Sequence, residues 1–286
     1  MRFIQVDVFA GTPYLGNPLA VFPDAAQLRR DQMQAIAREM NLSESSFVTR
    51  ADRDSYDVRI FTPQEELPFA GHPTIGTSWV LRHLGLVAGD QLVQHSAAGE
   101  TPVRVDDDLV WFTRSGTVGR DLEDDDIHAR RHVAAALGID EREVGLEARE
   151  LGRPGRLRPA VADAGVAQLL VPVSTVATLA SVSVTSNALA VLGGLGAYCF
   201  TATQAGRVRA RGFFPGLGIT EDPATGAAAA ALGLYLDDRV GGIDLEITQG
   251  VEINRESKIR VRAGSGRVEV GGRCALVAEG ALTTLP

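Results

Sequence analysis

The fold of this 286-residue chain is decided by the segment Phe69-Ala70-Gly71-His72-Pro73-Thr74-Ile75-Gly76-Thr77, which has a counterpart in Thr220-Glu221-Asp222-Pro223-Ala224-Thr225-Gly226-Ala227. Each segment places an ionisable residue directly before a proline and a glycine four positions after it, and each continues into an apolar helical stretch. A proline at the first helical position loses only an N–H that would have no partner in the helix. Both segments therefore predict helix starts.

The two predicted helix starts form the first candidate site. If the helices lie side by side, His72 and Asp222 face one another across a cleft whose floor presents backbone N–H groups. Helix N-termini bind anions through such groups, and titratable side chains beside them indicate chemistry. We therefore expect a site for a small carboxylate substrate.

Composition and charge indicate a globular protein and exclude several function classes. The length suits two domains, and a content of 45% hydrophobic and 22% charged residues is typical of a folded chain. The net charge is -8 without a basic stripe, which gives no support to nucleic-acid binding. No apolar run reaches the roughly 20 residues of a membrane span. The first residues read as a strand and not as a signal peptide, so we expect a cytoplasmic enzyme.

Cysteine, lysine and histidine usage narrows the chemistry. Cys199 and Cys274 have no paired spacing, so we expect buried thiols in a reducing compartment. The only lysine, Lys258, lies in an alternating strand-like segment, which argues against a Schiff base or pyridoxal phosphate. The histidines other than His72 show no metal-ligand spacing. We therefore expect neither a metal nor a cofactor.

The first part of the chain alternates strands with one amphipathic helix. Residues 4–8 alternate apolar and polar side chains, as a half-buried strand does. Asp24 is the expected cap of a helix that follows, in which Met33, Ile36 and Ala37 share one face and which ends near Asn41. Residues 102–105 and 109–112 flank the tight turn at 106–108 and predict a hairpin.

The second part repeats this arrangement of strands and helices. A helix is expected at Ala188–Leu195, and a second one at Ala224–Leu236, which is small and apolar all round and should be buried. Four strands follow to the end of the chain. Each half is thus expected to wrap strands around one apolar helix, in an α+β fold.

The composition shift after Arg114 sets the expected domain boundary. We expect an N-terminal half at residues 1–115, which carries Glu44 and His72, and a C-terminal half at residues 116–274, which carries Asp222. The last strand, about residues 275–286, is expected to pair back into the N-terminal half.

Glu44 is the candidate acid/base. It lies in Asn41-Leu42-Ser43-Glu44-Ser45-Ser46-Phe47, at the joint between the amphipathic helix and a strand. An apolar wall beside a carboxylate at such a joint would raise its pKa toward neutrality and make it a general base. The alternative from this segment alone is a surface glutamate at a helix end.

His72 and Asp222 also have structural alternatives. A helix N-terminus lowers the pKa of a nearby histidine, so His72 could be a neutral donor to a substrate or only a capping side chain. Asp222 before proline is a common N-cap. Two such positions in corresponding halves favour a site over two caps.

The order of short motifs resembles the PhzF family, the phenazine-biosynthesis isomerase-like proteins. The resemblance rests on blocks spread from residue 6 to residue 250, which cover nearly the whole chain: Val6-Asp7-Val8-Phe9, Gly16-Asn17-Pro18-Leu19-Ala20-Val21, Asn41-Leu42-Ser43-Glu44, the two segments quoted above and Gln249-Gly250.

This resemblance implies a fold and a set of roles. The fold would be that of the diaminopimelate epimerases, with two pseudo-symmetric halves that each wrap a mostly antiparallel sheet around a central helix. It implies a homodimer without a cofactor or metal. By similarity, Glu44 would move a proton between carbons of a cyclohexadiene amino acid, as in trans-2,3-dihydro-3-hydroxyanthranilate isomerase, and His72 and Asp222 would orient the substrate.

The contacts expected with the substrate come from both helix starts. They are Gly71 and Thr77 in the first segment, and Gly226 and Ala227 in the second. The backbone N–H groups of Gly226 and Ala227 are expected to bind an anion at the second helix start.

The chain departs from the family pattern at two places. Ala227 stands where the family often has serine, which removes a hydroxyl that would contact the substrate carboxylate. Gln249-Gly250 is followed by Val251-Glu252-Ile253-Asn254-Arg255-Glu256-Ser257, where the family more often has Arg-Pro-Ser. In epimerases of the same fold two cysteines stand near the places of His72 and Asp222, so a two-thiol racemase mechanism does not fit this chain.

Two other functions stay open at this point. One is an epimerase or racemase that uses Glu44 and a second residue such as Asp222 at one stereocentre. The other is a small-molecule-binding protein of the same fold without turnover, which Ala227 favours and the intact Glu44, His72 and Asp222 oppose.

Overall fold

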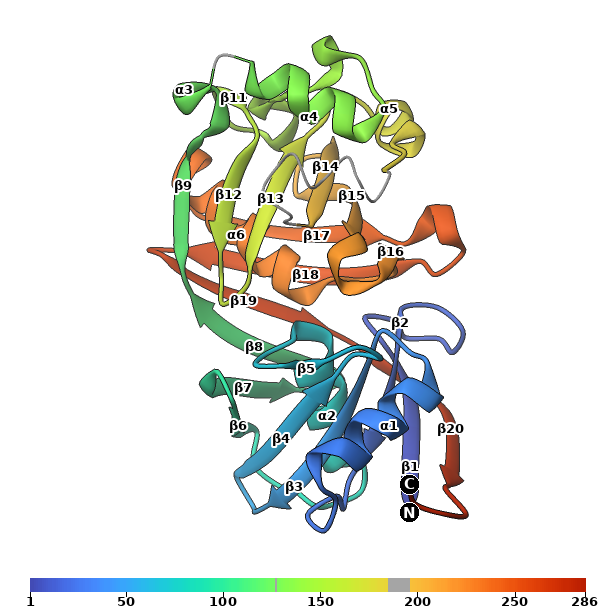
Figure 1. The fold of residues 1–286 in the computed structure, drawn as a ribbon. Coiled ribbons are helices and arrows are strands. Elements are labelled where there is room, and N and C mark those ends of the chain that lie inside the picture. Colours follow the sequence, from blue (N-terminus) through green and yellow to red (C-terminus); the bar gives the residue numbers. More distant parts are fainter. Residues whose placement is uncertain (127, 185–195) are drawn as a thin grey trace. The chain divides into compact units, whose positions relative to one another are not determined.

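The chain folds into two compact units in the computed structural model, which describes residues 1–126, 128–184 and 196–286. Unit 1 consists of Met1–Arg114 and Val270–Pro286, and unit 2 consists of Ser115–Glu269. Figure 1 shows the elements of each unit. The helix expected at Ala188–Leu195 lies outside the described residues.

Unit 1 combines helices α1 and α2 with the strands that surround them. In chain order its elements are β1 (Arg2–Val8), β2 (Asn17–Phe22), α1 (Arg30–Met40), β3 (Glu44–Ala51), β4 (Ser55–Phe61), β5 (Glu66–Leu67), α2 (Gly71–His83), β6 (Gln91–Ser96), β7 (Gly99–Asp106), β8 (Leu109–Ser115) and, from the end of the chain, β20 (Cys274–Ala281). The predicted hairpin is confirmed, because β7 pairs antiparallel with β8 across the turn at 107–108.

Unit 2 has the same kind of composition, with additional short helices. In chain order its elements are β9 (Thr117–Asp121), α3 (Leu122–Asp125), α4 (Ala129–Leu137), β10 (Leu146–Glu147), β11 (Arg156–Leu157), β12 (Ala160–Asp163), β13 (Ala167–Pro172), α5 (Val176–Ser181), β14 (Ala197–Gln204), β15 (Arg207–Phe214), β16 (Ile219–Asp222), α6 (Gly226–Val240), β17 (Ile243–Gln249) and β18 (Ser257–Gly264). Strand β19 (Arg267–Gly272) begins in unit 2 and ends in unit 1. Single turns of 3₁₀ helix lie at 141–143, 148–151, 215–217 and 251–253.

The strands of the two units pair in the same order. In unit 1, β1 is antiparallel to β2, β2 parallel to β3, β3 antiparallel to β4, and β4 parallel to β6. In unit 2, β12, β13, β14, β15 and β17 pair in the same succession. One outer strand is added to each copy, β20 on β1 and β9 on β12. Each unit is thus one copy of the same α+β motif.

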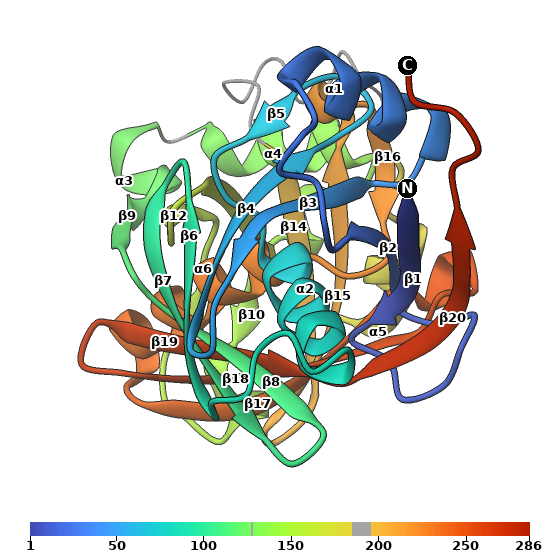
Figure 2. The ribbon, with the colours of Figure 1, turned by 90° about the horizontal axis from the view of Figure 1, so that it is seen from below.

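A buried helix lies at the centre of each copy. Helix α2 packs on β1, β2 and β3, and Figure 2 shows it among the strands of unit 1. Helix α6 packs on β12, β13 and β18 and is buried at every residue from Gly226 to Leu236. This confirms the prediction from its small apolar sequence, since a helix that is apolar on every side must be covered on every side.

Close packing of α2 depends on Gly76. A Cβ atom at this position would lie 2.6 Å from Leu19 Cδ2 and 2.7 Å from Val8 Cγ2, which is closer than side chains approach. The missing side chain therefore lets the helix lie directly against β1 and β2.

Both faces of β2 are buried, and alternate side chains of this strand point toward α2 on one face and α1 on the other. Leu19 faces α2, whereas Ala20 and Phe22 belong to the apolar cluster under α1. Phe22 stacks on Phe47 of β3 with ring centroids 4.7 Å apart. Because paired residues of neighbouring strands point to the same face, the side of each β3 residue follows from this register.

The structure corrects the predicted helix starts. Helix α2 begins at Gly71, so His72 and Pro73 lie within its first turn, and α6 begins at Gly226, three residues after Pro223, with Thr225 as its N-cap residue. Proline has no N–H group, but the N–H groups of the first helical turn have no partner within the helix. Proline is therefore tolerated anywhere in that turn and does not define its first residue.

The expected cap of α1 was also wrong. The helix begins at Arg30, and its N-cap residue is Arg29 and not Asp24. The predicted buried face of Met33, Ile36 and Ala37 is confirmed, as is the end at Asn41, which adopts the left-handed conformation. Among the described residues, no helix combines the length and apolar character needed to cross a membrane.

Candidate active site

Glu44 is the first residue of β3. In the parallel pair of β2 and β3, Glu44 is registered with Leu19, whose side chain touches α2. Glu44 therefore points to the α2 face of the sheet, and so does Asn17, two residues before Leu19 in β2. The prediction that Glu44 lies at a helix–strand joint is confirmed, whereas the alternative of a surface side chain is wrong, because Glu44 is only 8% exposed.

His72 lies beside Glu44. Its Nδ1 atom is 3.5 Å from Glu44 Oε2 and 3.3 Å from Asn17 Nδ2, and its side chain is 4% exposed. Nδ1 of His72 therefore lies within reach of both a carboxylate oxygen and a side-chain amide. Three segments far apart in sequence thus bring a carboxylate, an imidazole and an amide together within unit 1.

Burial keeps His72 uncharged. Loss of solvation lowers the pKa of His72 from 6.5 to about 3, and a contact with the Pro18 carbonyl opposes this shift only in part. At neutral pH the close approach of His72 and Glu44 is therefore not an ion pair.

Two polar atoms of α2 are buried without a hydrogen-bond partner in the part of the chain that the structure describes. They are Nε2 of His72 and Oγ1 of Thr77, and both side chains belong to residues that are almost fully buried. His72 is not the capping residue of α2, because it lies within the first turn and the N-cap residue is Ala70. Buried polar atoms of this kind are usually satisfied by water or a ligand, which agrees with the substrate contacts expected for His72 and Thr77.

Unit 2 carries the second predicted segment, in which Glu221 and Asp222 point to opposite faces. Both lie at the end of β16, where Asp222 is registered with Gly212 of β15. Adjacent residues of a strand point to opposite faces. Glu221 therefore points toward Arg211, and Asp222 points to the face of the sheet that packs on α6.

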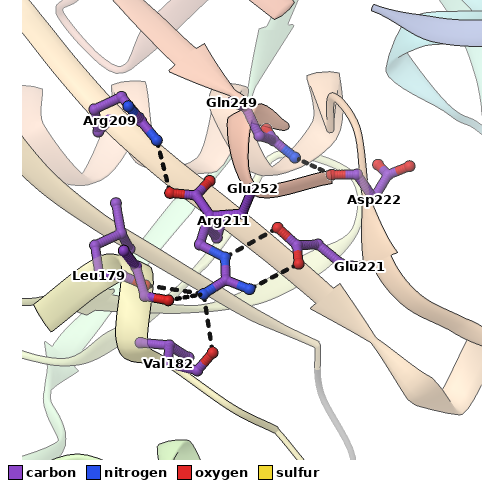
Figure 3. Close-up of polar contacts among 9 residues, drawn as sticks. Leu179, Val182, Arg209, Arg211, Glu221, Asp222, Gln249 and Glu252 are labelled. Atoms are coloured by element: carbon purple, nitrogen blue, oxygen red, sulfur yellow. Dashed lines mark hydrogen bonds and ion pairs between the residues drawn. The ribbon is translucent and has the colours of Figure 1, made fainter. Parts of the chain in front are cut away.

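Glu221 anchors the end of β16 through a buried ion pair. Figure 3 shows both of its carboxylate oxygens accepting hydrogen bonds from Arg211, at 2.9 and 2.8 Å. Arg211 Nη1 also donates to the carbonyls of Leu179, Ala180 and Val182 at the end of α5. A planar guanidinium suits this bidentate pairing, which fixes the strand next to Asp222.

Asp222 itself is 5% exposed and leads into a turn before α6. Its Oδ2 accepts a hydrogen bond of 2.6 Å from Thr225 Oγ1, and its carbonyl accepts one of 2.8 Å from Gln249 Nε2 (Figure 3). The alternative of a simple N-cap is wrong for Asp222, because Thr225 occupies that position.

The remaining predicted contacts lie at the two helix starts. Gly71 is the first residue of α2, and Gly226 and Ala227 are the first two residues of α6, all of them buried. Their N–H groups belong to the first turns, which have no partner within a helix. Gly71 and Thr77 belong to unit 1, and Gly226 and Ala227 to unit 2, so the expectation that His72 and Asp222 face each other stays a prediction.

The sequence analysis did not predict that Asn17 contacts His72 or that Gln249 contacts Asp222. Asn17 was quoted only as part of a motif, although a buried amide at the start of a strand must find hydrogen-bond partners. In β17 every second residue is buried, and Gln249 is the last of these after Leu245 and Ile247. A polar side chain at a buried position of a strand indicates a specific hydrogen-bonding contact. Within the described residues, no group of three or more His, Cys, Asp or Glu side chains could hold a metal ion.

Comparison with known proteins decides the family. The family model described as PhzC-PhzF, phenazine biosynthesis-like protein, matches residues 6–280. The chain belongs to the PhzF family. A relative from Pseudomonas aeruginosa, named trans-2,3-dihydro-3-hydroxyanthranilate isomerase, is 39% identical over 98% of both chains. A relative of the same name from Pseudomonas chlororaphis is 34% identical over 95% of both chains. Both relatives are named isomerases, and this chain is an isomerase of the PhzF type.

Solved structures confirm the PhzF fold. A phenazine biosynthesis protein of the PhzF family from Bacillus anthracis superposes with a TM-score of 0.83 over 99% of both chains, at 21% identity. A probable proline racemase from Agrobacterium radiobacter has a TM-score of 0.63 over 99% of this chain and 92% of its own, at 13% identity. These likenesses are of fold alone, and they bear out the expected α+β, epimerase-like architecture.

Proposed function

We propose that Glu44 removes a proton from one carbon of a small cyclic amino-acid-like carboxylate and returns it to another carbon on the same face. The names of the two Pseudomonas relatives support trans-2,3-dihydro-3-hydroxyanthranilate or a close analogue as the substrate. The reaction would be a 1,3 proton shift that uses one base. As the sequence resemblance implies, it would need no cofactor and would be carried out by a homodimer, which we place in the cytoplasm.

The observation that supports this proposal most is the pairing of a buried carboxylate with a neutral imidazole. Glu44 lies 3.5 Å from His72, whose low pKa leaves it without charge at neutral pH. Because the imidazole is neutral, Glu44 can accept a proton and give it back without breaking an ion pair with His72. One such base is sufficient when both carbons lie on the same side of the substrate.

The other residues bind and orient the substrate in this proposal. His72 presents Nε2 of its neutral ring, Asp222 binds the substrate amine as a carboxylate, and Thr77 offers its hydroxyl; Nε2 and this hydroxyl have no partner among the described residues. The first N–H groups of α6, at Gly226 and Ala227, bind the substrate carboxylate, and Gly71 provides the equivalent groups at α2.

A label-transfer experiment tests the reaction class. The substrate is deuterated at the carbon that loses its proton, and the product is analysed by NMR after turnover in ordinary water. Deuterium recovered in part at the second carbon supports a shift carried by one sheltered base.

Two other results would contradict the proposal. Solvent hydrogen at one stereocentre with inversion, and no movement of the double bonds, would assign an epimerase. Binding without turnover over a panel of cyclic amino acids would assign a binding protein.

A further inference from the structure

Gln249 is a buried amide whose four hydrogen-bonding positions are all used by the segment around Asp222. Its Oε1 accepts from Tyr198 Oη at 2.9 Å and from the Thr225 N–H at 3.1 Å. Its Nε2 donates to the Asp222 carbonyl at 2.8 Å and to Thr225 Oγ1 at 3.0 Å. An amide has two donor hydrogens and two acceptor lone pairs, so Gln249 is completely satisfied.

The orientation of this amide follows from its partners. The Thr225 N–H can only donate and the Asp222 carbonyl can only accept, so Oε1 must face the former and Nε2 the latter. A flipped amide would place Nε2 against the Thr225 N–H, donor against donor, and Oε1 against the Asp222 carbonyl, acceptor against acceptor. All of these buried groups would lose their hydrogen bonds. The direction of every hydrogen bond in the network is therefore determined.

This direction reaches the carboxylate of Asp222 through Thr225. Because Gln249 donates to Thr225 Oγ1, the hydroxyl hydrogen of Thr225 is left to point at Asp222 Oδ2, 2.6 Å away. A donor fixed in this way favours the charged carboxylate and holds it in one orientation. The hydrogen bonds from Gln249 to Thr225 and from Thr225 to Asp222 thus link β17 to the carboxylate of Asp222.

The sheet leaves room for this network at Gly212. A Cβ atom there would lie 2.9 Å from Thr225 Oγ1 and 3.2 Å from Gln249 Nε2. Gly212 is registered with both Tyr198 and Asp222, so its missing side chain opens the point where all the partners meet.

We propose that Gln249 and Thr225 are positioning residues that hold Asp222 as an oriented carboxylate for the substrate amine. This inference rests on the proposed function for the role of Asp222, but its structural content does not depend on turnover. It predicts that the Thr225 hydroxyl, and not the bulk of the side chain, sets the protonation and orientation of Asp222.

The test compares Thr225→Val with Thr225→Ser. The carboxyl carbon of Asp222 is titrated by ¹³C NMR in the resting protein and assigned with Asp222→Asn. We expect the titration midpoint to rise by about one pH unit in Thr225→Val, since a hydrogen bond to a charged group is lost, and to keep the wild-type value in Thr225→Ser. On the proposed substrate, the acid limb of kcat/KM should move by the same amount in Thr225→Val.

Thr201→Val is the matched control. Thr201 is a fully buried threonine of unit 2 whose hydroxyl has no partner among the described residues, and the same substitution there should leave the titration of Asp222 unchanged. Gln249→Met is the second variant, and it should raise the midpoint in the same direction, because the Thr225 hydroxyl is no longer directed.

The outcomes separate this inference from the proposed function. An unchanged Asp222 midpoint in Thr225→Val, or an equal rise in Thr225→Ser or Thr201→Val, overturns the positioning role. Retention of isomerase activity in Glu44→Gln would overturn the proposed function and leave the NMR result on Asp222 intact.

Discussion

His72 Nδ1 lies 3.5 Å from Glu44 Oε2 in a site where the imidazole is neutral. The pKa of His72 is about 3 in the folded chain, against 6.5 for an exposed histidine. Between these values the unfolded chain binds a proton at this residue and the folded chain does not. The free energy of unfolding should therefore fall as the pH drops from 6.5 toward 3, by about 1.4 kcal/mol per pH unit for this group.

His72→Asn isolates this contribution. Between pH 6.5 and pH 4.5 the wild-type protein should lose about 2 to 3 kcal/mol more stability than the variant, as measured by urea unfolding at both pH values. Other carboxylates titrate in both proteins, so their contribution cancels in the comparison. Equal losses in the two proteins would contradict this account, because they would show that folding leaves the pKa of His72 unchanged.

The sequence was most informative where burial is complete. The all-apolar segment after Gly226 could only be a covered helix, and the alternation of apolar and polar side chains over residues 4–8 was sufficient to predict a strand there. These features depend on periodicity alone, which is a property of neighbouring residues.

The helix starts and the long-range contacts could not be predicted in this way. Thr225 is the N-cap residue of α6, and its N–H donates to the side chain of Gln249, 24 positions later. The contact between His72 and Asn17 spans 55 positions. Gln249 and Asn17 are polar residues at buried positions of strands. Such a residue indicates that a contact exists, but the sequence does not identify its partner.

Gly76→Ala should displace α2. The added methyl group would lie within 2.7 Å of Leu19 and Val8, and overpacking of this kind costs about 1 to 3 kcal/mol. Because His72 lies on the same helix, activity should fall together with stability. Gly264→Ala is the control, since an added Cβ there meets nothing within 4 Å, and its unfolding midpoint should stay close to that of the wild type. A fully stable Gly76→Ala protein would contradict the packing described for α2.

Ala227→Ser should strengthen substrate binding. The position lies in the first turn of α6 and is 8% exposed, so a hydroxyl there adds a donor beside the proposed carboxylate site. A net hydrogen bond of about 1 kcal/mol corresponds to a decrease in KM of about fivefold, with kcat little changed. An unchanged or higher KM in a protein of wild-type stability would show that the substrate carboxylate binds elsewhere.

The central claim is that Glu44 carries the proton, and Glu44→Gln tests it most directly. The amide keeps the size of the side chain and its place beside His72 but cannot accept and return a proton. We predict that kcat on the proposed substrate falls at least 10³-fold, while Glu39→Gln, a carboxylate of α1 outside the site, retains wild-type activity. Substantial isomerase activity in a folded Glu44→Gln protein would contradict the account.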